Sequence, residues 1–187
     1  MRAPAPPYRG EGPHALWHVS DDPTLGHFEP HRAKTALTDE PLVWAIDTRH
    51  LPLYWFPREC PRCTFWAGPD TTETDVAQLL DGDRAARVHV IEEGWFDHLA
   101  AATLEVYRMP EETFVESSET AGYWTSRHAV NALDRMTIGD LVGRHARAGI
   151  ALRLVSNLWP LWDRVVASSL AFSGMRLRNA DGRQPTK

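Results

Sequence analysis

The feature that most constrains the fold of this chain is the order of its short apolar segments. Six or seven stretches have the length and composition of β-strands, and three or four have helical spacing. They do not alternate as strand, helix and strand, which a doubly wound parallel sheet would require. We therefore expect an α+β fold in which helices flank a split or strongly twisted sheet, mixed or antiparallel.

Residue spacing within these segments predicts the individual elements. Strands are expected at 15–19, 42–46, 87–91, 104–109, 123–126, 132–138 and 151–155, and helices at 51–56, 72–80, 138–145 and 158–169. Thr72 and Asp75 form a capping box, and Pro160 suits the first turn of the last helix. Gly174 is expected to stop that helix, whose apolar residues recur at helical intervals.

The length of 187 residues fits one domain, which we expect to span residues 14–178. Residues 1–13 and 179–187 are polar and rich in proline or glycine, so mobile tails are expected there. No apolar run approaches the length of a membrane span, and the N-terminus lacks a secretory signal. These properties predict a cytoplasmic protein that does not associate with membranes.

Charge and motif content argue against several functions. The net charge is -5 and the acidic residues are scattered, so the chain offers no broad basic face for duplex nucleic acid. Neither common phosphate loop occurs, which leaves nucleotide binding through such a loop unsupported. The sequence also has no nucleophile elbow and no HExxH motif.

Cys60 and Cys63 are the only cysteines, in the sequence Cys-Pro-Arg-Cys. This spacing permits half of a zinc site, a redox pair, or two small apolar residues without a chemical role. A mixed zinc site would need histidines, and two pairs stand four residues apart, His14 with His18 and His27 with His31. The redox interpretation needs a helix after the motif, whereas a strand-like segment, 64–66, follows it.

His18 and Ser20 stand two residues apart on the first predicted strand, so they project to the same face. An imidazole and a hydroxyl side by side can hold a hydroxylated or phosphorylated ligand, or transfer protons near neutral pH. The alternative is structural: Ser20 caps the following turn, and His18 is a satisfied core histidine.

A second group of candidate ligand-binding residues is rich in aromatic rings with polar tips. Flat rings stack on planar ligands, and arginine binds phosphate through two parallel hydrogen bonds. The same composition also builds an ordinary core with a charged rim. The group consists of Trp44, Asp47, His50, Tyr54, Trp55 and Phe56, and is followed by Arg58 and Arg62.

Four glutamates precede the predicted strand at 123–126, and one carboxylate at the edge of a cleft could orient a sugar hydroxyl. Most of them are expected to lie on the solvated surface. They are Glu111, Glu112, Glu116 and Glu119.

Several segments resemble a family of uncharacterised bacterial proteins classified only as a domain of unknown function. They are LWHVS at 16–20, FEP at 28–30, VWAID at 43–47, LYWFPRECPR at 53–62, AGYW at 121–124 and NLWPLWD at 157–163. The resemblance covers nearly the whole predicted domain and implies no particular activity.

The order of His18, Tyr54 and a later acidic residue is similar to the ADP-ribosyltransferase superfamily. In that superfamily a histidine on the first strand holds NAD, a tyrosine stacks on nicotinamide, and a glutamate on a late strand orients the ribose. This sequence has Gly122 where the glutamate would be expected, and Glu119 is the nearest acidic replacement. The resemblance implies an NAD or nucleotide pocket, with His18, Tyr54 and Glu119 as the catalytic set.

The leading hypothesis is therefore an ADP-ribosyltransferase-like enzyme or NAD-binding domain that needs no metal. Such chemistry passes through an oxocarbenium-like state that a stacked ring, a ribose clamp and one carboxylate can stabilise. One alternative is a non-catalytic module that binds a ligand or another protein. A further alternative is a metal-binding protein that uses Cys60 and Cys63.

Overall fold

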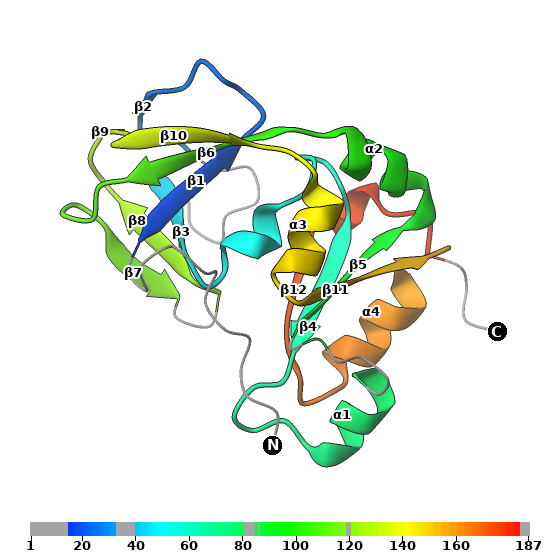
Figure 1. Ribbon diagram of the computed structural model, residues 1–187. Coiled ribbons are helices and arrows are strands. Elements are labelled where there is room, and N and C mark those ends of the chain that lie inside the picture. Colours follow the sequence, from blue (N-terminus) through cyan, green and yellow to red (C-terminus); the bar gives the residue numbers. More distant parts are fainter. Residues whose placement is uncertain (1–14, 33–39, 81–84, 86, 119–120, 184–187) are drawn as a thin grey trace. The chain divides into compact units, whose positions relative to one another are not determined.

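The computed structural model describes residues 15–32, 40–80, 85, 87–118 and 121–183 (Figure 1). The chain divides into two compact units. The six-stranded unit contains residues 15–55 and 103–138 of the described chain, and the four-stranded unit contains residues 56–102 and 139–183. The mixed α+β class expected from the sequence is confirmed, whereas the single-domain boundaries at 14 and 178 stay a prediction.

The six-stranded unit is built on an antiparallel sheet with the strand order β10-β6-β1-β3-β8-β7. The strands are β1 (Leu16–Ser20), β3 (Val43–Asp47), β6 (Leu104–Met109), β7 (Val115–Ser118), β8 (Tyr123–Ser126) and β10 (Asp134–Ile138). A separate pair joins β2 (His27–Phe28) to β9 (Val130–Asn131). After β3 the 3-10 helix η1 (Leu51–Tyr54) follows, with a proline in its first turn and buried Leu51 and Leu53.

The register of this sheet assigns side chains to its two faces. Trp17 lies opposite Ile46 on one side and Arg108 on the other, and Ile46 lies opposite Tyr123. Residues directly opposite one another in antiparallel strands project to the same face. These four residues therefore share one face, which we call the Trp17 face.

The other face of the same sheet carries an apolar cluster, so we call it the Phe28 face. Its buried members are Leu16, Phe28, Val43, Ala45, Tyr107, Met109, Phe114 and Val130. Burial of this cluster removes apolar surface from water and holds β2 and β9 against the sheet.

The four-stranded unit contains a mixed sheet with the order β11-β5-β4-β12. Its strands are β4 (Arg62–Trp66), β5 (Arg87–Glu92), β11 (Ile150–Val155) and β12 (Ala171–Met175), and only β11 with β5 is parallel. Its helical elements are α1 (Glu73–Leu79), η2 (Glu93–Trp95), α2 (Phe96–Ala101), α3 (Leu141–Arg147), α4 (Trp159–Val166) and η3 (Leu177–Asn179). Within the described residues, no helix is long and apolar enough to cross a membrane.

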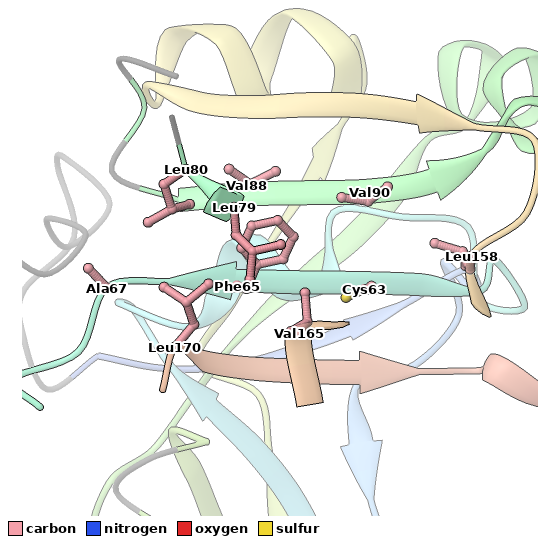
Figure 2. Packing of buried hydrophobic residues seen from close by; sticks show 10 residues of the cluster. All are labelled: Cys63, Phe65, Ala67, Leu79, Leu80, Val88, Val90, Leu158, Val165 and Leu170. Carbon is pink, nitrogen blue, oxygen red and sulfur yellow. The ribbon is translucent and has the colours of Figure 1, made fainter. Parts of the chain in front are cut away.

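One face of the four-stranded sheet forms the core of this unit, shown in Figure 2. Alternate residues of β4 and β5 point into it, among them Phe65 and Val88, which lie opposite each other. Val165 of α4 and Leu79 of α1 cover these side chains. The apolar stripe of α4 is the packing element that its helical spacing predicts.

Two predicted helix signals can be followed in the structure. Thr72 precedes α1, and its hydroxyl accepts a hydrogen bond from the Asp75 backbone amide, which confirms the Thr72 cap. The reciprocal bond of a capping box is absent between these two residues, because the Thr72 backbone amide donates to the Ser169 hydroxyl. Gly174 does not stop the last helix. It lies inside β12, where an added Cβ would stand 2.4 Å from the Trp162 ring of α4, so the glycine lets the indole lie against the strand.

The segment from Asn179 to Arg183, expected as part of a mobile tail, makes defined contacts. The Asn179 amide donates to the Glu59 carbonyl, and the Asp181 backbone amide donates to the buried Glu92 carboxylate at 3.0 Å. The same carboxylate accepts the Leu158 backbone amide at 3.0 Å just before α4. Glu92 thus joins the start of α4 to the C-terminal segment.

Candidate functional site

The end of β3 holds an Asp–His pair. The Asp47 carboxylate accepts hydrogen bonds from the His50 backbone amide at 2.8 Å and from His50 Nδ1 at 2.9 Å. Because Nδ1 donates to a carboxylate, a neutral His50 ring carries its lone pair on Nε2. The pair fixes the orientation of the ring at the start of η1.

Gly122 packs directly against this pair. Its φ of +68° lies in the left-handed region, and an added Cβ would stand only 2.2 Å from His50 Nδ1. Its carbonyl accepts the Asp47 backbone amide at 2.9 Å. No side chain fits here, so the glycine found where the resemblance placed a glutamate follows from local packing and backbone conformation.

Three half-buried aromatic residues lie in the same part of the six-stranded unit as Asp47, His50 and Gly122. The rings of Trp44 and Tyr123 meet edge to face with centroids 5.8 Å apart, and the Tyr54 hydroxyl donates to the Tyr123 hydroxyl at 3.3 Å. Trp44 stands two residues from Ile46 on β3, so it shares the Trp17 face with Tyr123. We call Trp44, Tyr54 and Tyr123 the aromatic group.

The indole nitrogen of Trp44 is the chemically informative atom of the aromatic group. It is buried, and among the described residues it has no hydrogen-bond partner. A buried donor without an acceptor costs about 1–3 kcal/mol. An acceptor from outside the polypeptide, a ligand or a water molecule, would remove this cost.

His18 and Ser20 lie on the Phe28 face, away from the aromatic group. His18 follows Trp17 on β1, its Nδ1 donates to the Trp44 carbonyl at 2.9 Å, and its ring contacts Phe28. The Ser20 hydroxyl accepts the Asp22 backbone amide at 3.1 Å. The structure therefore does not bring His18 and Tyr54 to one face, and both polar side chains take part in the structural contacts that were the alternative.

A buried glutamate opposite Ser20 was not predicted from the sequence. Glu105 of β6 lies directly opposite Ser20, is buried, and accepts the Thr137 hydroxyl at 2.9 Å. The sequence feature that could have indicated Glu105 is a carboxylate at a position of an alternating strand that is expected to point inward. Of the four glutamates considered, Glu111 pairs with Arg108, Glu112 and Glu116 are exposed, and Glu119 lies outside the described residues.

Arg58 and Arg62 belong to the four-stranded unit, where both contact other parts of that unit. The Arg62 guanidinium donates to the Cys60 carbonyl at 2.9 Å and lies over the Phe56 ring. Arg58 is exposed, and its carbonyl accepts the guanidinium of Arg176 at 3.0 Å. Trp44 and the aromatic group belong to the other compact unit.

Cys60 and Cys63 are buried thiols without a bond between them. Burial raises the pKa of each thiol to about 12, so both thiols are protonated in the folded protein at neutral pH. Of the histidines considered, His14 lies outside the described residues and His27 bonds to Asn131. Within the described chain no three His, Cys, Asp or Glu residues gather as metal ligands, and Cys63 belongs to the apolar core of the four-stranded unit.

A buried histidine pair in the four-stranded unit is a second feature that the sequence did not indicate. His145 Nδ1 donates to the Leu141 carbonyl at 2.7 Å, so its Nε2 is the acceptor for His89 Nδ1 at 3.0 Å. His89 Nε2 then carries a lone pair, which is buried and lacks a partner in the described part of the chain. Burial lowers the pKa of His145 to about 4 and that of His89 well below its usual value.

The chain belongs to a family of unknown function, DUF6886, whose match covers residues 17–180. No curated protein and no solved structure matches the chain. The sequence segments predicted a family of unknown function, and this prediction is confirmed. The resemblance to ADP-ribosyltransferases finds no support in the comparisons.

This membership spans most of both compact units, so the aromatic group and the histidine pair lie within the family match. It supplies no substrate and no activity. Any function has to be argued from the side chains themselves.

Proposed function

We propose that this protein binds a small ligand with a flat ring at the aromatic group, and that NAD or a related nucleotide is the ligand class to test first. The observation that carries the proposal is the buried Trp44 indole N–H, which lacks an acceptor among the described residues beside two half-buried tyrosines. Ligand sites combine aromatic walls with a few placed polar groups in this way.

The three aromatic side chains suit a flat heterocycle. A ring can stack on the exposed part of Trp44 or Tyr54, while an acceptor nitrogen or oxygen on its edge takes the indole hydrogen. The Tyr54 and Tyr123 hydroxyls, 3.3 Å apart, can each donate or accept. Nicotinamide and adenine both have such edges.

The neighbouring Asp47–His50 pair gives the site a rigid support. Both side chains are held by short hydrogen bonds, and Gly122 locks the backbone that leads into Tyr123. A site held by such contacts loses less conformational entropy on binding than a mobile one.

The proposal concerns binding and does not include ADP-ribosyl transfer. His18 lies on the opposite face of the sheet from the aromatic group, and Glu119 lies outside the described residues. We therefore propose ligand binding without catalysis, which corresponds to the non-catalytic module considered from the sequence.

Replacement of Trp44 by phenylalanine tests the proposal. Isothermal titration calorimetry with NAD, ADP-ribose, adenosine and nicotinamide should show binding to the wild type that weakens about tenfold in Trp44→Phe, because the ring is kept and one buried hydrogen bond is lost. Trp124→Phe is the matched control, since the Trp124 indole nitrogen is also buried without a described partner but lies with the Phe28 cluster. It should bind like the wild type.

Two results would contradict the proposal. One is the absence of binding and of thermal stabilisation with all four compounds at millimolar concentration. The other is equal weakening in Trp44→Phe and Trp124→Phe, which would show that the loss is structural.

A further inference from the structure

We infer that the ligand of the aromatic group carries an anionic group, such as a phosphate, and that Arg108 of β6 binds it. This inference rests on the proposed function and adds the charge of the ligand and the residue that recognises it. No sequence motif pointed to Arg108, because it is the only basic residue of β6.

Arg108 lies on the same face of the sheet as the aromatic group. The register runs Arg108, Trp17, Ile46 and Tyr123 across β6, β1, β3 and β8. Trp44 lies two strands from Arg108 across the sheet and two residues from Ile46 along β3. This corresponds to roughly 12 Å between the Cα atoms of Arg108 and Trp44. A nucleotide is long enough to bridge such a separation.

The Arg108 guanidinium lies against the ring of Trp17. Its Cζ is 5.3 Å from the centroid of that ring, and Trp17 belongs to β1, the strand between β6 and β3. Stacking on an indole holds the planar group in one orientation and leaves its edge available for hydrogen bonds.

One side of the guanidinium has a carboxylate partner and the other does not. Arg108 Nη2 donates to Glu111 Oε1 at 3.1 Å, a pair in which both side chains are partly exposed. Arg108 Nη1 is buried and has no partner among the residues that the structure describes. Asp134, opposite Arg108 on β10, uses one carboxylate oxygen to accept the Arg135 backbone amide.

The Trp17 face thus presents two buried donors without a described acceptor, Trp44 Nε1 and Arg108 Nη1. The indole is neutral and suits the edge of a ring, whereas the guanidinium suits an anion. A molecule with a ring at one end and a phosphate at the other satisfies both donors. A nucleoside monophosphate, or the corresponding half of a dinucleotide, has this form.

Matched ligands with and without a phosphate test the inference. We expect AMP to bind the wild type at least tenfold more tightly than adenosine, and nicotinamide mononucleotide more tightly than nicotinamide riboside, with the difference falling as salt rises. Arg108→Gln should remove this preference while adenosine binding stays within twofold. Arg127→Gln, an exposed arginine paired with Glu40 in the same unit, is the control and should keep the preference.

Equal affinity of the wild type for AMP and adenosine would overturn the inference and leave the proposed function standing. So would equal weakening of both ligands in Arg108→Gln. If the glutamine variant does not fold, Arg108→Lys provides a second variant. An undiminished preference for AMP in Arg108→Lys at high salt would contradict recognition of the phosphate by the guanidinium of Arg108. If no nucleoside or nucleotide binds at all, the proposed function fails together with the inference.

Discussion

Acidification from pH 7 to pH 5 should destabilise this protein through the buried histidine pair. Both rings are fully buried, and the hydrogen bonds from His145 to the Leu141 carbonyl and from His89 to His145 are those of neutral imidazoles. Burial lowers the pKa of His145 to about 4, and nearby Arg62 acts in the same direction against the hydrogen bond to Leu141. Burial also lowers the pKa of His89 well below its usual value, and His145, Arg87 and Arg62 add to the effect.

The direction follows from proton linkage. A histidine whose pKa is lower in the folded than in the unfolded state binds more protons when unfolded, so stability rises with pH between the two values. For His145 that window runs from about pH 4 to the ordinary value of 6.5. The free energy of unfolding should therefore fall by about 2 kcal/mol from pH 7 to pH 5 through His145 alone, with His89 acting in the same direction.

Urea unfolding followed by circular dichroism at pH 7, 6 and 5 measures this loss. The exposed carboxylates with lowered pKa, such as Asp75 and Asp140, start from an ordinary value of 3.8 and contribute below this range. The variant His145→Asn cannot titrate, so it should be less stable at pH 7 yet lose clearly less stability on acidification. His98→Gln, an exposed histidine of α2, should keep the wild-type slope.

A His145→Asn protein with the same pH dependence as the wild type would refute the argument. So would a wild type whose free energy of unfolding is unchanged between pH 7 and pH 5. Either result would mean that the ring nitrogens are hydrated or can be protonated within the folded protein.

Two further predictions concern residues with a structural role. Gly122→Ala should lower the free energy of unfolding by about 3 kcal/mol or more, because the added methyl group would clash with His50 and the backbone there is left-handed. Gly149 has the same φ of +68° but open space around it, so Gly149→Ala should lower the free energy of unfolding by only about 1–2 kcal/mol in chemical denaturation. Equal losses in the two variants would contradict the steric argument. Cys60 and Cys63, with thiol pKa values of about 12, should react with a disulfide reagent at pH 8 only when urea unfolds the chain, and prompt labelling of the native protein would contradict their burial.

The strands with continuous apolar or alternating residues were predictable from the sequence. β3, β5 and β6 each match an expected segment within one residue, because burial of such runs requires the extended conformation found. β7 was missed since its Val-Glu-Ser-Ser sequence is mostly exposed, and β12 was missed because Ser173 and Gly174 interrupt its apolar pattern. In β12 the packing of Trp162 replaces the missing apolar side chain.

The candidate site was predictable only where its residues are close in sequence. Trp44, Asp47, His50 and Tyr54 follow one another on β3 and η1, and the structure places them around one corner of the six-stranded unit. The relation of His18 to Tyr54 depends on which strands pair and in which register. A shift of one residue exchanges the two faces of a strand, and no local pattern specifies that choice.

The roles of Arg108 and Glu105 could not be predicted from the sequence for the same reason. They lie three residues apart on β6 and therefore on opposite faces, one over Trp17 and the other beside Ser20. Their meaning comes from partners that are distant in sequence, which only the folded sheet brings close.

The contacts of Glu92 bear on how the protein can be handled in the laboratory. Its carboxylate accepts hydrogen bonds from two backbone amides, that of Leu158 just before α4 and that of Asp181. Asp181 is 89 positions after Glu92 in the chain. A shortened version that stops at Arg178 would leave a buried negative charge with only one of these donors. Purification tags and fusion partners should therefore leave Asp181 and its hydrogen bond to Glu92 in place.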